Sequence, residues 1–103
     1  MNSNEQILQD AKTRVEFLLS QKLRGKIEEE IELALRAEGI TRARTTILAG
    51  TPGRLRIEAP GQERLLCSAL HFWCTALVSI AATPENLAEF LARARGWRPY
   101  QLQ

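Results

Sequence analysis

The first third of the chain carries two apolar stripes at helical spacing. The first consists of Leu8, Ala11, Val15, Leu18 and Leu19, and the second of Leu23, Ile27, Ile31, Ala34 and Leu35. Both are typical of amphipathic helices. Ser3 and Asn4, which precede the first stripe, are residue types that cap helix N-termini, and Gly39 follows the second stripe where a left-handed glycine commonly ends a helix.

These stripes belong either to one helix or to two. A single helix over residues 5–38 would be about 51 Å long, whereas a domain of this size is about 30–35 Å across. The stripes would also point about 150° apart around such a helix. We therefore expect either a break near Gly25 or a projecting helix whose apolar surface meets a partner.

The next segment is predicted to be a β-hairpin. Residues 41–49 are rich in β-branched side chains, residues 54–59 alternate polar and apolar, and the connection over 50–53 holds the Pro52-Gly53 pair typical of a type II turn. The inner face is expected to hold Ala43, Thr45, Ile47, Leu55 and Ile57. The outer face is expected to hold the hairpin arginines, which are Arg42, Arg44, Arg54 and Arg56.

Residues 65–82 are the most ambiguous segment, because these eighteen residues carry no formal charge at neutral pH. The segment is interpreted either as one buried helix or as a short helix from Glu63 to about Leu70 followed by a strand from Trp73 to Ile80. We favour the single helix.

A final helix is predicted from Pro84 to Arg95. Thr83 supplies a capping hydroxyl, Pro84 is suited to the first helical position, and Gly96 ends the helix. The sequence thus predicts a single α+β domain over residues 1–103, in which the C-terminal helix packs on a small antiparallel sheet.

Composition is that of an ordinary soluble globular domain, with 45% hydrophobic and 25% charged residues, but charge divides the chain. The net charge of +2 combines a balance of −2 over residues 1–38 with +4 over residues 39–103. Every basic residue in the second part is an arginine. Arginine suits contacts with phosphate, carboxylate and protein interfaces.

Cys67, His71 and Cys74 invite a metal or nucleophile interpretation, which geometry disfavours. On one helix the two cysteines would lie about 10.5 Å apart along the axis, too far for a disulfide or for one zinc ion to reach both. Their apolar surroundings favour buried thiols, and the N-terminus shows no secretory pattern, which together indicate the cytoplasm. We predict no metal, no cofactor and no enzymatic activity.

The hairpin arginines are the first candidate binding face, because like charges on paired strands repel unless an anion or an acidic partner meets them. The alternative is a solvated face, or neutralisation by the acids within residues 28–32. Nucleic acid is a weaker candidate partner, since the net charge is small and no aromatic residues interleave with the arginines. Trp97 and Tyr100 form a second candidate, a tail that either anchors a partner or packs on the last helix.

The apolar segment is at the lower length limit for a membrane span and contains polar residues, so a membrane partner is not expected. Surplus apolar surface on the two stripes and in residues 65–82 instead favours self-association. The sequence therefore predicts a non-catalytic protein-interaction or adaptor module that acts as a homo-oligomer, for example a homodimer. The alternative is a nucleic-acid-binding module that uses the hairpin arginines.

Overall fold

The structure is a computed structural model that describes residues 3–51, 53–73 and 77–99. Within these residues the chain forms α1 (Asn4–Ser20), α2 (Arg24–Ala37), β1 (Arg44–Leu48), β2 (Arg54–Glu58), α3 (Glu63–Leu70), β3 (Leu77–Ala81) and α4 (Pro84–Ala94). The strands make one antiparallel sheet in the order β1-β2-β3. The predicted α+β class is confirmed.

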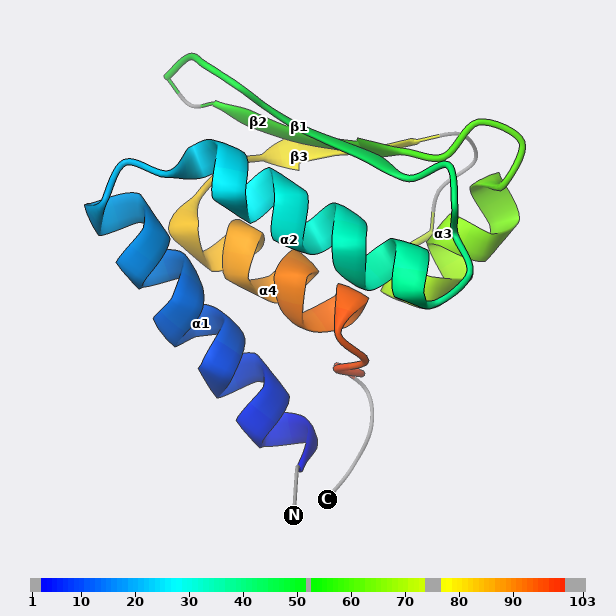
Figure 1. Cartoon of the computed structure of the whole chain (residues 1–103), viewed down its shortest axis with the longest axis horizontal. Coiled ribbons are helices and arrows are strands. Elements are labelled where there is room, and N and C mark those ends of the chain that lie inside the picture. The colour runs from blue at the N-terminus through cyan, green and yellow to red at the C-terminus, as the bar shows by residue number, and fades with distance from the viewer. Residues whose placement is uncertain (1–2, 52, 74–76, 100–103) are drawn as a thin grey trace.

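The sheet lies over a layer of helices that covers only one of its faces (Figure 1). α4 runs beneath the strands, α2 lies below the sheet along its β1 edge, and α1 packs against α4 further from the sheet. The buried strand residues Leu55, Ile57 and Val78 belong to one apolar cluster with residues of all four helices named above. Most members of both predicted stripes are buried in this cluster. The apolar surface that suggested self-association is therefore largely satisfied within one chain.

The break expected near Gly25 is confirmed, and its left-handed residue is Lys22, between the end of α1 and the start of α2. Lys22 adopts a φ of 59°, and the Leu23 N–H donates to the Leu18 carbonyl at 2.8 Å, which is the hydrogen bond of a Schellman ending. Gly25 lies inside α2. This break turns the second stripe onto the core, so α1 and α2 fit within overall dimensions of 34 × 33 × 20 Å. The projecting helix considered above is not formed.

The predicted hairpin forms, and Thr45 lies opposite Ile57 in its register. The predicted type II turn centred on Pro52-Gly53 includes Pro52, which lies outside the described residues, so the turn type stays a prediction. Gly50, at the start of the connection, adopts a positive φ of 147°. Glycine is required at position 53 for space, because a Cβ there would lie 2.7 Å from the Leu48 carbonyl oxygen.

The apolar segment over residues 65–82 divides into α3 and β3, so the favoured single helix is wrong and the helix-and-strand alternative is correct. α3 ends where His71 adopts a φ of 49° and the Phe72 N–H donates to the Cys67 carbonyl at 3.1 Å. Arg93 of α4 fixes this end, because its Nη1 donates to the carbonyls of Leu70 and His71 at 3.0 and 2.9 Å. The chain is then free to pair with β2.

Cys67 is disulfide-bonded and only partly buried, which corrects the prediction of buried thiols. The separation calculated for a single helix does not apply, because α3 ends at Leu70. Cys74 lies outside the described residues. The cysteines therefore no longer support a reducing location.

Candidate interaction surface

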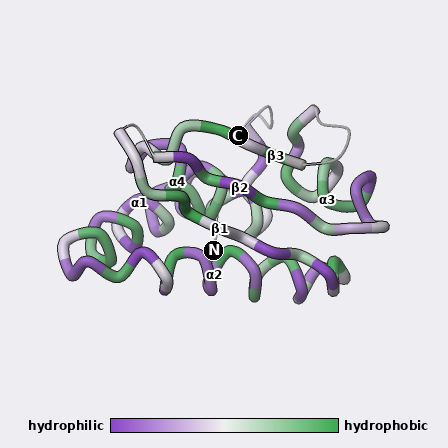
Figure 2. The backbone as a smooth tube through the Cα atoms, turned by 90° about the horizontal axis from the view of Figure 1, so that it is seen from above, coloured by the Kyte–Doolittle hydropathy of each residue, from purple (hydrophilic) through white to green (hydrophobic). Residues whose placement is uncertain are grey.

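Figure 2 looks onto the sheet from above, and the residues that point to the face left uncovered by the helices are mostly polar. Described side chains that alternate toward it are Arg44, Thr46 and Leu48 of β1, Arg54, Arg56 and Glu58 of β2, and Ser79 and Ala81 of β3. Three arginines and one glutamate give these residues a positive balance. The outward positions predicted for Arg44, Arg54 and Arg56 are confirmed.

Two of these arginines are held by neighbours. Arg54 donates from Nε to the Ser79 hydroxyl at 3.1 Å and from Nη2 to the Ser79 carbonyl at 3.0 Å. Arg56 lies 3.8 Å from the Glu58 carboxylate in a partly exposed ion pair. Arg44 stands opposite Glu58 in the strand register, and its guanidinium has no partner among the described residues. Arg44 therefore offers the most freely available positive charge of the three.

Arg42 does not join this face, because β1 begins two residues later. Its Nη1 donates to the Pro60 carbonyl at 3.3 Å, and its backbone N–H donates to the Gln62 side chain at 2.9 Å. The predicted strand position of Arg42 is thus corrected. The structure gathers three hairpin arginines on the uncovered face and leaves the fourth at the end of the sheet.

α2 runs alongside β1 (Figure 2), and its acids contact the strand backbone. The contacts run from the Ile47 N–H to Glu28 (2.5 Å), from the Thr45 N–H to Glu32 (2.9 Å) and from Arg36 to the Ala43 carbonyl (3.1 Å). We name Glu28, Glu32 and Arg36 the capping row. Among the described residues, no acid of α2 pairs with a hairpin arginine, so the neutralisation considered above does not occur there.

The repeat distances of helix and strand explain the capping row. Its members are four residues apart, or about 6.0 Å along a helix axis, and the strand residues they contact are two apart, or about 6.6–6.8 Å. Thr45 and Ile47 belong to an edge strand and point their N–H groups away from β2. The carboxylates of Glu28 and Glu32 thus accept from backbone N–H groups, and the guanidinium of Arg36 donates to a backbone carbonyl. Sequence reasoning missed this row, because acids and a base spaced by four are also typical of a solvated helix face.

The opposite edge of the sheet, at β3, has no such row. The Ala82 N–H donates to the Gly53 carbonyl at 2.9 Å. Because backbone groups of an antiparallel strand point toward and away from its neighbour at alternate residues, those of Ser79 and Ala81 point away from β2. The outward carbonyls accept from side chains, that of Ser79 from Arg54 and that of Ala81 from Asn86 at 2.9 Å. The outward N–H groups of Ser79 and Ala81 have no partner among the described residues.

Glu30 joins α2 to both other long helices from the side away from β1. Its carboxylate lies 2.6 Å from Arg14 Nη2 of α1 and 2.9 Å from Arg95 Nη2 after α4. The hydrogen bond from Arg14 is the largest cause that lowers the pKa of Glu30, and the positive charges of Arg14 and Arg95 add to it. This network fixes α2 in the position from which the capping row reaches β1.

Trp97 packs on the chain itself. Its indole is half-buried against the apolar cluster, with the Arg93 guanidinium 5.8 Å from the ring centroid. Tyr100, the other half of the predicted tail, lies outside the described residues. Partner binding by this pair stays a prediction.

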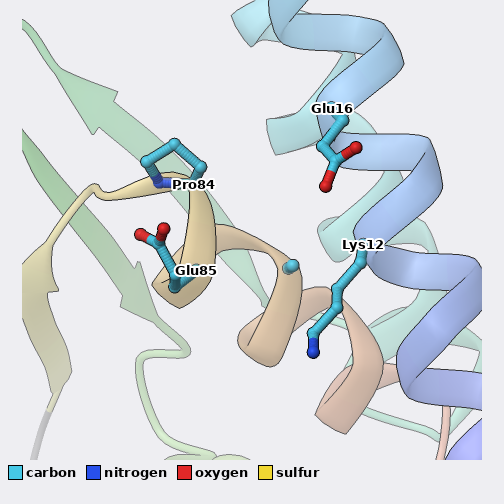
Figure 3. Close-up of a pocket in the computed structure, with 5 residues that line it drawn as sticks. Lys12, Glu16, Pro84 and Glu85 are labelled. Atoms are coloured by element: carbon cyan, nitrogen blue, oxygen red, sulfur yellow. The ribbon is translucent and has the colours of Figure 1, made fainter.

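A hollow of about 240 Å³ lies between α1 and the start of α4. Lys12 and Glu16 project from α1 toward Pro84 and Glu85 across it (Figure 3). Because its charged groups are of both signs, the hollow favours no class of charged ligand. The uncovered face and the β3 edge are therefore the stronger candidates.

Within the described ranges, no group of three or more His, Cys, Asp or Glu residues is arranged to hold a metal ion. No helix in that part of the chain is long and apolar enough to cross a membrane. Comparison with known proteins finds no matching family model, no similar curated protein and no similar solved structure.

Proposed function

We propose that the protein is a non-catalytic interaction module that assembles with a second copy of itself along the β3 edge. The observation that carries this proposal is the difference between the two sheet edges. α2 occupies the side of β1, whereas β3 leaves two outward backbone N–H donors without a partner among the described residues. Unpaired edge groups are a template for strand addition.

A symmetric antiparallel contact would place Ser79 opposite Ser79 of the second copy. Each Ser79 N–H would donate to the other copy's Ser79 carbonyl, which has a second lone pair beside the one that accepts from Arg54. The result is one six-stranded antiparallel sheet with a continuous basic face. The two Arg54 side chains would lie near the symmetry axis, so added salt should strengthen the contact by screening their repulsion.

Light scattering behind a sizing column tests this proposal with the wild type, Ser79→Pro and Ser79→Thr. Proline removes an N–H that points away from β2, so the bonds between β2 and β3 remain. We expect an oligomer for the wild type and Ser79→Thr, and the 11.6 kDa monomer for a folded Ser79→Pro. A monomeric wild type would overturn self-association. An oligomeric Ser79→Pro would instead move the contact away from β3.

Nucleic-acid binding is a second candidate, favoured by Arg44, Arg54 and Arg56 on one uncovered face. Glu58 stands among them, and no described residue that alternates toward this face is aromatic, so stacking platforms are missing there. Titration with a single-stranded oligonucleotide at increasing salt separates the two functions. Binding to phosphates weakens as salt rises, whereas self-association at β3 should strengthen.

A further inference from the structure

A second cavity, independent of the β3 edge, lies where β1 begins. It measures about 390 Å³ and is lined by Arg36, Thr41, Arg42, Arg44 and Pro60. Three of these five residues are arginines and none is acidic. The arginines come from the last turn of α2, from the turn that follows it and from the first position of β1.

Two of the guanidiniums are held in place by the protein. Arg36 donates to the Ala43 carbonyl at 3.1 Å and lies 3.6 Å from the Glu32 carboxylate. Arg42 donates to the Pro60 carbonyl and lies against Gly61, where a Cβ would come within 2.6 Å of its Nη1. Gly61 thus leaves the space that Arg42 occupies. Each guanidinium has five N–H donors, so most remain available.

The three arginines differ in whether an acidic side chain pairs with them. Arg36 has a carboxylate partner in Glu32, whereas Arg42 and Arg44 have none among the described residues. The nearby Glu63 accepts from the Gly61 backbone N–H at 2.9 Å, and backbone hydrogen bonds lower its pKa. Two unneutralised guanidiniums match the charge of about −1.5 to −2 on a phosphate monoester at neutral pH. Their planar forks suit phosphate oxygens.

We propose that this cavity binds the phosphate group of a small phosphate monoester, with Arg42 and Arg44 contacting the oxygens and Arg36 supporting them. A cavity of about 300 Å³ or more has room for a small organic ligand beyond the phosphate itself. The proposal does not rest on self-association. Ser79→Pro should leave it intact, so the two proposals fail separately.

The test follows backbone amide shifts of residues 41–44 by NMR during titration with inorganic phosphate, at constant ionic strength set with chloride. We expect saturable shifts at millimolar phosphate, and smaller ones with acetate, which carries a single charge. Phosphoserine and adenosine 5′-monophosphate present the same group on different bodies. If one of them binds more tightly than inorganic phosphate, the cavity recognises the amino acid or the nucleoside that carries the phosphate group.

Arg44→Gln and Arg42→Gln should each weaken phosphate binding by about tenfold or more, the effect of one lost charge-assisted contact. Arg64→Gln is the matched control, because it removes an exposed arginine from nearby α3 that does not line the cavity. Arg44 has no described side-chain partner, so its variant should fold normally. Absence of saturable shifts, or an equal loss in Arg64→Gln, would overturn the proposal.

Discussion

β1 and β3 are both edge strands with outward-pointing backbone N–H groups, but the groups that surround these donors differ. Thr45 and Ile47 on β1 donate their outward N–H groups to carboxylates of α2. On β3, the outward N–H of the exposed Ser79 has no partner among the described residues. A helix alongside an edge strand therefore prevents strand addition there. The comparison predicts growth of the sheet at β3 alone.

The largest expected effect on stability comes from shortening a buried side chain of β2, the strand that pairs with both edge strands. Ile57 belongs to β2, the central strand; it is 0% exposed and lies opposite Thr45 on one side and Val78 on the other. Ile57→Ala should lower the free energy of unfolding by about 2–5 kcal/mol, and hydrogen exchange should accelerate equally at both edges. Denaturant unfolding measures the first effect, and Thr46→Ala on the uncovered face should stay within about 0.5 kcal/mol. A faster exchange at β3 alone would mean that the edges do not share β2 as their support.

A smaller effect should follow from opening the β1 edge. Glu32→Ala leaves the Thr45 N–H without its acceptor, and loss of a hydrogen bond to a charged group costs about 1.5–3 kcal/mol. The Thr45 amide should exchange faster with solvent, as measured by NMR. Glu29→Ala is the control, because Glu29 is exposed and its pair with Lys26 is 3.5 Å long. If Glu32→Ala and Glu29→Ala were equally stable, the capping row would contribute little to the edge.

Several elements of this architecture could be predicted from the sequence because local residues determine them. Thr83 caps α4 by accepting from the Asn86 N–H at 3.1 Å, and Gly39 and Gly96 adopt the positive φ expected after α2 and α4. The alternation of residues 54–58 determined which arginines face outward. Each of these signals lies within a few residues of the structure it predicts.

Other features depended on contacts between distant segments. The end of α3 is held by Arg93, more than twenty residues away, and local propensity alone left the short helix ending at about Leu70 as the less favoured alternative. The break between α1 and α2 was predicted only as lying near Gly25; its left-handed residue is Lys22, and the turn there places the second stripe on the core. The three-arginine cavity was also missed, since Arg36 was counted with the helix and apart from the hairpin.

The smallest expected effect concerns Glu30, which holds α2 in place behind the β1 edge. Its folded pKa is lowered, chiefly by the hydrogen bond from Arg14, so its contribution to stability is present above the unfolded pKa of about 4.3. That contribution is lost as pH falls through the lowered folded value. Glu30→Gln should therefore cost about 1 kcal/mol at neutral pH, because both arginine partners are partly solvated. The gap to wild type should close on acidification, measured by denaturant unfolding at several pH values. Glu29→Gln is the exposed control on the same helix, and a gap that stayed constant with pH would exclude the Arg14 pair as its cause.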